Sequence, residues 1–181
     1  MDRIAKLEAA LDIHCAAIDG LHVDDPRRLT GPGHLWDRPG AVMDVVCKGF
    51  DPENLSRLWD RHARQVLDAV GWQDQDLICR VFQGGVSLGI SAPMDQLYSA
   101  TFGVRTAWHY CAAALSDTES LPFEDMIKDL KRVMAQEANP ALISLIDAAA
   151  VHDVDILCDD DAVSLGHGVG SRTWPVGDLP P

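Results

Sequence analysis

The residue types most able to do chemistry gather near the C-terminal end, in "DDDAVSLGHGVGSRTW", residues 159–174. Asp159, Asp160 and Asp161 supply carboxylates, and His167 supplies an imidazole between glycines. Mg²⁺ and Ca²⁺ prefer several oxygen ligands, so these four residues form one candidate metal site. However, the carboxylates lack the alternating spacing of a calcium-binding loop, and adjacent residues of an extended chain point in opposite directions. We therefore expect no bound metal and interpret the triplet as a solvated turn, with the metal site as the alternative.

The glycines of "GHGVG" could bring backbone N–H groups close to a phosphate, but only if a helix began directly after them. The segment that follows, "SRTWPVGD", has no helical pattern. A second segment, "GVSLG", has the outline of a nucleophile elbow, yet Ser87 lies within an alternating apolar run that indicates a strand. The sequence thus predicts no nucleotide cofactor, and no catalysis by this chain alone.

Two other segments offer polar groups for binding. In "SAPMDQLYSAT" the polar side chains lie at the start of a predicted helix, where unpaired N–H groups and the positive end of the dipole favour a carboxylate. Ser91 is explained there as a helix cap. "RRLTGPGHLW" offers guanidinium groups that can bind carboxylate or phosphate through two bonds, although ion pairs with Asp24 and Asp25 are an alternative. The predicted substrate-binding residues are Arg28, Thr30, Trp36, Ser91, Asp95 and Tyr98.

Composition limits the function classes. The 181 residues are 47% hydrophobic, enough for one folded core, and the net charge is −13, from 15 basic and 28 acidic residues. Nucleic-acid binding needs clustered Lys and Arg, so we expect no nucleic-acid partner, and a cationic or neutral ligand fits better. No apolar run reaches the length of a membrane span, and the five cysteines are scattered, which together favour a cytoplasmic protein without disulfides.

Apolar periodicity and the positions of Gly and Pro predict the elements that must position these residues. Helices are expected at residues 2–19, 52–70, from Pro93 to about 115, 121–138 and from Pro140, with strands at 41–50, 154–158 and on both sides of a turn at Gly84-Gly85. This order favours an α+β fold with two layers, a small mixed sheet covered by helices on one face. We expect a single domain over residues 1–173 and a linker-like tail over 174–181.

Three segments in the same order, "RRLTGPGHLWDRPGAVMDV", "GGVSLGISAPMDQLYSAT" and "DDDAVSLGHGVGSRTWPV", resemble the N-terminal module of Mur-ligase-like proteins related to cyanophycin synthetase. In that family the module precedes an ATP-dependent ligase part, and the stretch from Ser164 to Gly168 resembles the passage toward it. The chain departs from the family pattern because it lacks the G-T-N-G-K-[ST] phosphate loop and the nucleotide-binding lobes of an ATP-grasp. Ligation is therefore not expected of this chain alone.

The resemblance implies a non-catalytic accessory or substrate-binding module. It would bind an amino acid or a cationic peptide, or dock on an ATP-dependent ligase domain or subunit. Two alternatives belong to other classes. One is a small independent enzyme that uses His167 or His34 with a carboxylate, or a metal at the acidic triplet. The other is a structural homodimer formed through the helix that carries Trp108.

Overall fold

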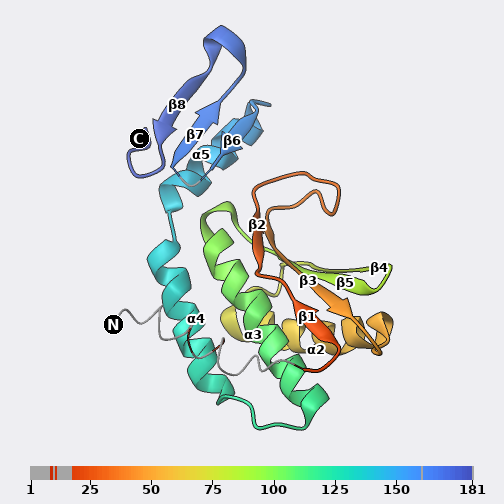
Figure 1. Ribbon diagram of the computed structural model, residues 1–181. Coiled ribbons are helices and arrows are strands. Elements are labelled where there is room, and N and C mark those ends of the chain that lie inside the picture. Colours follow the sequence, from red (N-terminus) through yellow and green to blue (C-terminus); the bar gives the residue numbers. More distant parts are fainter. Residues whose placement is uncertain (1–8, 10, 12–17, 160, 181) are drawn as a thin grey trace.

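The computed structural model describes residues 9, 11, 18–159 and 161–180. Their main feature is a five-stranded antiparallel sheet with two long helices packed on one face (Figure 1). The strand order is β1-β3-β5-β4, and β2 also pairs with β3, beyond the end of β1. The strands are β1 (Leu21–Val23), β2 (Arg27–Leu29), β3 (Gly40–Cys47), β4 (Leu77–Phe82) and β5 (Gly85–Ser91).

The first described long helix, α2 (Pro52–Val70), begins and ends where local chemistry requires. The Asp51 side chain accepts a hydrogen bond from the Glu53 N–H and so caps the helix, while Pro52 at the first turn needs no N–H partner. Gly71 ends the helix in the left-handed conformation, with φ 94°, which glycine adopts without steric cost. These features confirm the helix predicted over residues 52–70.

The core lies between the large sheet on one side and two helices, α2 and α3 (Leu97–Ser116), on the other. The short 3₁₀ turn η1 (Met94–Gln96) directly precedes α3. Strand residues alternate between the two faces, so Val86, Leu88 and Ile90 of β5 all point toward the helices and are fully buried. α3 is apolar on most of its surface and is buried along almost its whole length. α4 (Phe123–Glu137) packs against α2 and α3 and extends the helical layer.

A smaller unit follows at the C-terminal end, visible at the top of Figure 1. α5 (Pro140–Val151) lies beside a three-stranded antiparallel sheet of order β6-β7-β8. Its strands are β6 (Ile156–Cys158), β7 (Ala162–Leu165) and β8 (Arg172–Pro175), and the 3₁₀ turn η2 (Gly168–Gly170) lies between the last two. Val163 of β7 is fully buried and anchors this unit.

The α+β class predicted from the sequence is confirmed, with three corrections. Every strand pairing is antiparallel, so neither sheet is mixed. The predicted loop before residue 40 contains β2, and the segment after Cys158 forms two further strands of a separate sheet. The predicted boundary at residue 173 falls inside β8, because Trp174 pairs with Val163 and the Val176 N–H donates to the Asp161 carbonyl at 2.9 Å. The predicted helix over residues 2–19 lies almost entirely outside the described residues.

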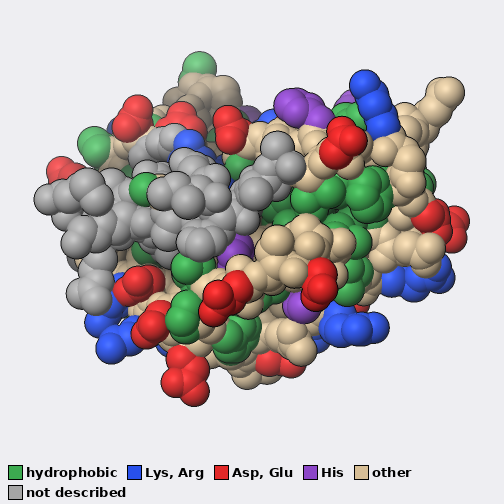
Figure 2. All heavy atoms as spheres, turned by 60° about the horizontal axis from the view of Figure 1, so that its bottom comes forward, with side chains coloured by type: hydrophobic (Ala, Val, Ile, Leu, Met, Phe, Trp, Pro, Cys, Tyr) green, Lys and Arg blue, Asp and Glu red, His purple; other side chains and the backbone are tan. Residues whose placement is uncertain are grey.

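Within the described part of the chain, no helix combines the length and the apolar character that crossing a membrane requires. Carboxylates are dispersed over the face drawn in Figure 2 and do not gather into one patch. The net charge of −13 therefore does not mark a single site on that face.

Candidate functional site

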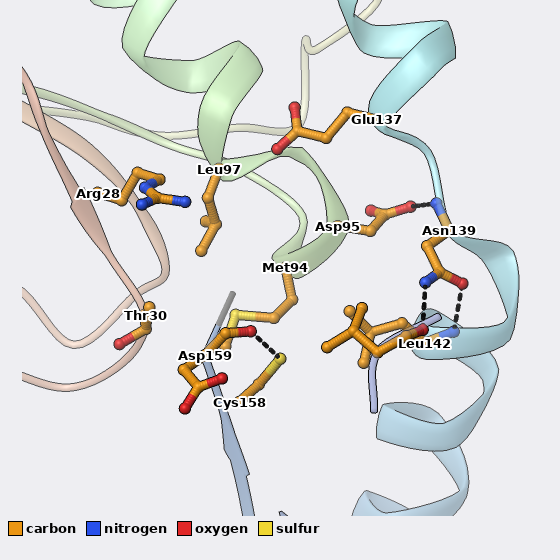
Figure 3. A pocket seen from close by; sticks show the side chains of 11 residues that line it. Arg28, Thr30, Met94, Asp95, Leu97, Glu137, Asn139, Leu142, Cys158 and Asp159 are labelled. Carbon is orange, nitrogen blue, oxygen red and sulfur yellow. Dashed lines mark hydrogen bonds between the residues drawn. The ribbon is translucent and has the colours of Figure 1, made fainter. Parts of the chain in front are cut away.

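A cavity of about 330 Å³ lies between the large sheet and the C-terminal unit. Its walls come from β2, the turn η1, the start of α3, the end of α4, the start of α5 and the chain after β6 (Figure 3). The described lining residues are Arg28, Thr30, Met94, Asp95, Leu97, Glu137, Asn139, Leu142, Cys158, Asp159 and Val176. One guanidinium and three carboxylates thus surround a small volume, although they come from segments far apart in the sequence.

The pairing register of β2 explains why an arginine reaches this cavity. Arg28 pairs with Ala41, whose side chain is fully buried on the helical face, so Arg28 also points toward that face. Arg27 pairs with Val42 and points to the opposite face, where its guanidinium binds the Asp44 carboxylate at 2.7 Å. The alternative that these arginines pair with Asp24 and Asp25 is thus wrong for Arg27.

Asp95 fixes the entry into α5. Its Oδ2 accepts a hydrogen bond from the Asn139 N–H at 2.7 Å, and the Asn139 side chain in turn caps α5 by accepting from the Leu142 N–H (Figure 3). The Asn139 amide also donates to the Val176 carbonyl at 3.2 Å. The C-terminal unit is therefore tied to η1 through one carboxylate that also lines the cavity.

The Glu137 side chain caps the N-terminal end of α3. The Tyr98 and Ser99 N–H groups donate to its two carboxylate oxygens at 2.6 and 2.7 Å, and the Ser99 hydroxyl donates to Oε2 at 2.6 Å. Gln96 precedes α3 and gives no side-chain cap, so the carboxylate from α4 takes that role. The unpaired N–H groups of this helix end thus bind a carboxylate, and it comes from α4 of the chain itself.

Asp159 occupies the turn between β6 and β7. Its Oδ1 accepts hydrogen bonds from the Asp161 and Ala162 N–H groups at 2.9 and 2.7 Å. These backbone donors, that of Ala162 foremost, lower the pKa of the Asp159 carboxyl below its ordinary value, because they stabilise the charged form. The expected solvated turn is thus present, and it also forms part of the cavity wall.

The structure brings Arg28, Thr30 and Asp95 of the predicted binding residues to this cavity and places the other three elsewhere. Trp36 belongs to the loop that covers the opposite face of the large sheet, where its indole lies against Gly89. The Tyr98 ring packs edge-on against Phe102, with ring centroids 5.0 Å apart. The Tyr98 backbone N–H adjoins the site, because it donates to Glu137.

Ser91 is a structural residue, and its predicted role as a helix cap is wrong. Its side chain is buried, its hydroxyl donates to the Gln75 side-chain oxygen at 2.7 Å, and it accepts from the Asp76 N–H at 2.8 Å. These bonds fasten the segment before β4 to the end of β5. The 3₁₀ turn that follows is preceded by Pro93 and has no side-chain cap.

The alternative metal site does not assemble. His167 and Asp155 lie at one end of the β6-β7 hairpin, with His167 Nε2 2.7 Å from Asp155 Oδ2, whereas Asp159 and Asp161 lie in the turn at its other end. Asp160 lies outside the described residues. Among those that are described, no three His, Cys, Asp or Glu side chains are grouped to hold a metal ion.

The described lining residues of the cavity include charged groups but no imidazole. None of its described lining residues is a histidine, so neither His167 nor His34 can act there as acid or base. The only thiol in the lining, Cys158, donates to the Asp159 carbonyl at 3.4 Å. Groups of both charge signs therefore border the cavity, a set that can bind a charged ligand.

Sequence reasoning missed Glu137 and Asn139, the two residues that join α4 and α5 to the site. Asn139 followed by Pro140 carried a usable signal, because Asn directly before Pro is typical of a helix start. Glu137 carried none, since its partners are 38 and 39 residues away in the chain.

Neither the known protein-family models nor the curated proteins match this chain.

Proposed function

We propose that this chain is a non-catalytic substrate-binding or accessory module whose ligand, an amino acid or a short cationic peptide, binds in the cavity beside Arg28. The observation that carries the proposal is the meeting of Arg28 with Asp95, Glu137 and Asp159 around one cavity. Such a set of charges suits a ligand that is itself both anionic and cationic.

The size of the cavity supports a small ligand. Pockets for small molecules usually measure roughly 300 to 1,000 Å³, and this one, at about 330 Å³, lies at the lower end. Met94, Leu97 and Leu142 add apolar surface that can contact aliphatic carbons. An amino acid fits this volume, and a longer peptide would extend into the adjoining hollow of about 420 Å³ along Arg28, Thr30, Asp159 and Asp161.

The hydrogen bonds already made in the site indicate how the ligand would lie. Glu137 occupies the N–H groups at the start of α3, so a ligand carboxylate would instead meet the Arg28 guanidinium. Asp95 and Asp159 each use one oxygen for backbone N–H groups, which leaves Asp95 Oδ1 and Asp159 Oδ2 for an ammonium or guanidinium. The ligand would thus span the cavity from Arg28 to the two aspartates.

The resemblance to the N-terminal module of Mur-ligase-like and cyanophycin-synthetase-like proteins suggests the context. In such a context the module would hold the substrate for an ATP-dependent ligase domain or subunit, which would supply the nucleotide site. A homodimer through α3 is not proposed, because Trp108 is 2% exposed and lies in the core.

Titration calorimetry tests the proposal with arginine, lysine, the dipeptide Asp-Arg and the neutral dipeptide Ala-Ala. We expect the most heat from arginine, lysine and Asp-Arg, which have a cationic side chain, and weaker binding of Ala-Ala, which has none. Asp95→Asn, which keeps an oxygen for the Asn139 N–H but removes the charge, should lose affinity about tenfold. Asp74→Asn, an exposed carboxylate outside the cavity, is the matched control. No heat from any of these ligands, or equal affinities in both variants, would overturn the proposal.

A further inference from the structure

A second hollow, unrelated to the cavity beside Arg28, runs along the contact between α2 and α4. It consists of two adjoining cavities of about 490 and 820 Å³, which share Ala69 and Phe123. The smaller cavity lies along α4. The larger one extends from α2 to Tyr110 and to residues 120–123. Together they form a continuous groove, here called the α2/α4 groove.

The floor of the α2/α4 groove is apolar and rigid. Tyr110 packs between two rings, with centroid distances of 5.4 Å to Phe123 and 6.4 Å to His62. The Tyr110 hydroxyl donates to the Leu121 carbonyl at 3.2 Å, which fixes the ring. Burial lowers the pKa of His62, which favours the uncharged imidazole beside the Tyr110 ring.

The rim on α4 carries three basic side chains and one carboxylate, Glu124, although the chain as a whole has a net charge of −13. Across the groove, α2 contributes the carboxylate of Asp68. Lys128 and Lys131 both line the groove, both are exposed, and neither forms an ion pair within the described residues. Arg132 is also on this rim, but its guanidinium binds Asp129 at 2.6 Å. Two unpaired ammonium groups one helical turn apart therefore border an apolar floor.

We propose that the α2/α4 groove binds an amphipathic helix of a protein partner, with apolar residues on the buried side and Asp or Glu beside them. Grooves between two helices commonly take a third helix through apolar residues at i, i+3, i+4 and i+7. Lys128 and Lys131 lie about 4.5 Å apart along the axis of α4, which matches carboxylates one turn apart on the incoming helix. Lys128 and Lys131 therefore favour an incoming helix that places carboxylates opposite them.

The experiment uses the full chain as bait for a displayed library of random 16-residue helical peptides. We expect the enriched peptides to combine helical apolar spacing with a net negative charge. The most enriched peptide is then synthesised with a fluorescent label and its Kd measured by anisotropy. In K128E/K131E the Kd should rise about tenfold, and 0.5 M NaCl should weaken binding to the wild type.

The matched control is K48E/R172E, which changes the net charge equally at two exposed residues outside the groove and outside the cavity beside Arg28. Its Kd should stay within about twofold of the wild-type value. Circular dichroism of both variants establishes that they fold. The proposal is overturned if no peptide is enriched, if the enriched peptides are neutral or basic, or if both double variants weaken binding equally. Preferential capture of anionic lipid vesicles or oligonucleotides through the same lysines would also overturn it.

Discussion

Glu137 should be one of the residues on which the stability of the fold most depends, and Glu137→Ala tests this directly. The substitution removes the acceptor of three hydrogen bonds at the start of α3, two from backbone N–H groups and one from the Ser99 hydroxyl. Tyr98 is partly exposed, so water can replace the partner of its N–H. Ser99 is fully buried, and both of its donors would lose their partner inside the protein.

The expected loss of stability follows from this difference in exposure between Tyr98 and Ser99. Each buried donor left without a partner costs about 1 to 3 kcal/mol, and the lost attraction between the carboxylate and the helix dipole adds about 0.5 kcal/mol. We expect the free energy of unfolding of Glu137→Ala to fall by about 3 kcal/mol, which lowers the Tm of a chain of this size by about 6 to 12 °C. Glu137→Gln keeps an acceptor oxygen and should lose about 1 to 2 kcal/mol.

Urea denaturation followed by tryptophan fluorescence measures these differences. Glu119→Ala is the matched control, because that carboxylate is exposed before α4 and its removal should change stability by less than about 0.5 kcal/mol. If Glu137→Ala unfolds within 0.5 kcal/mol of the wild type, the carboxylate does not cap α3 and the assignment is refuted.

Two further predictions concern the large sheet and its core. In Gly40→Ala the added Cβ would overlap the carbonyl oxygen of Ile90 on the neighbouring strand. The free energy of unfolding measured by urea titration should therefore fall by about 3 kcal/mol. An unchanged urea midpoint would contradict this close approach of the two strands. Burial raises the pKa of Cys79 to about 11, and those of Cys111 and Tyr110 to about 12. Above pH 9 the unfolded chain releases these protons while the folded chain retains them, so stability should fall as pH rises from about 9 to 12 in denaturation series, and a flat profile would refute the burial of these groups.

The sequence predicted those elements whose signals are local. The start of α2 could be recognised from Asp51 and Pro52, and its end from Gly71. The turn of the β4-β5 hairpin could be recognised from Gly84. β2 could not be predicted, because three residues among prolines and glycines become a strand only by pairing with β3. The same holds for β7 and β8, which lie on either side of the glycines that suggested a loop or a phosphate site. β7 becomes a strand by pairing with β6 and β8, and β8 by pairing with β7.

The residues of the candidate site were likewise predicted only in part. Asp95 and Arg28 were recognised by type, as a carboxylate near a helix start and a guanidinium in an acidic chain. Trp36 and Ser91 were grouped with them because they lay near in sequence. However, Trp36 lies in a loop on the opposite face of the large sheet, and the Ser91 hydroxyl bonds to the segment before β4. Sequence distance was a poor guide, since neighbouring strand residues face opposite sides of a sheet.

The sequence by itself determined the α+β class, the main helices and the net charge of −13, because each depends on periodicity or composition along the chain. The tertiary structure alone decided that a glutamate at the end of α4 caps α3 and that an arginine of β2 faces aspartates from η1 and the β6-β7 turn. It alone also decided that α2 and α4 enclose an apolar groove bordered by Lys128 and Lys131. The physical reason is that hydrogen bonds and charges act through space over a few ångströms, and only the packing of distant segments brings these groups within that range.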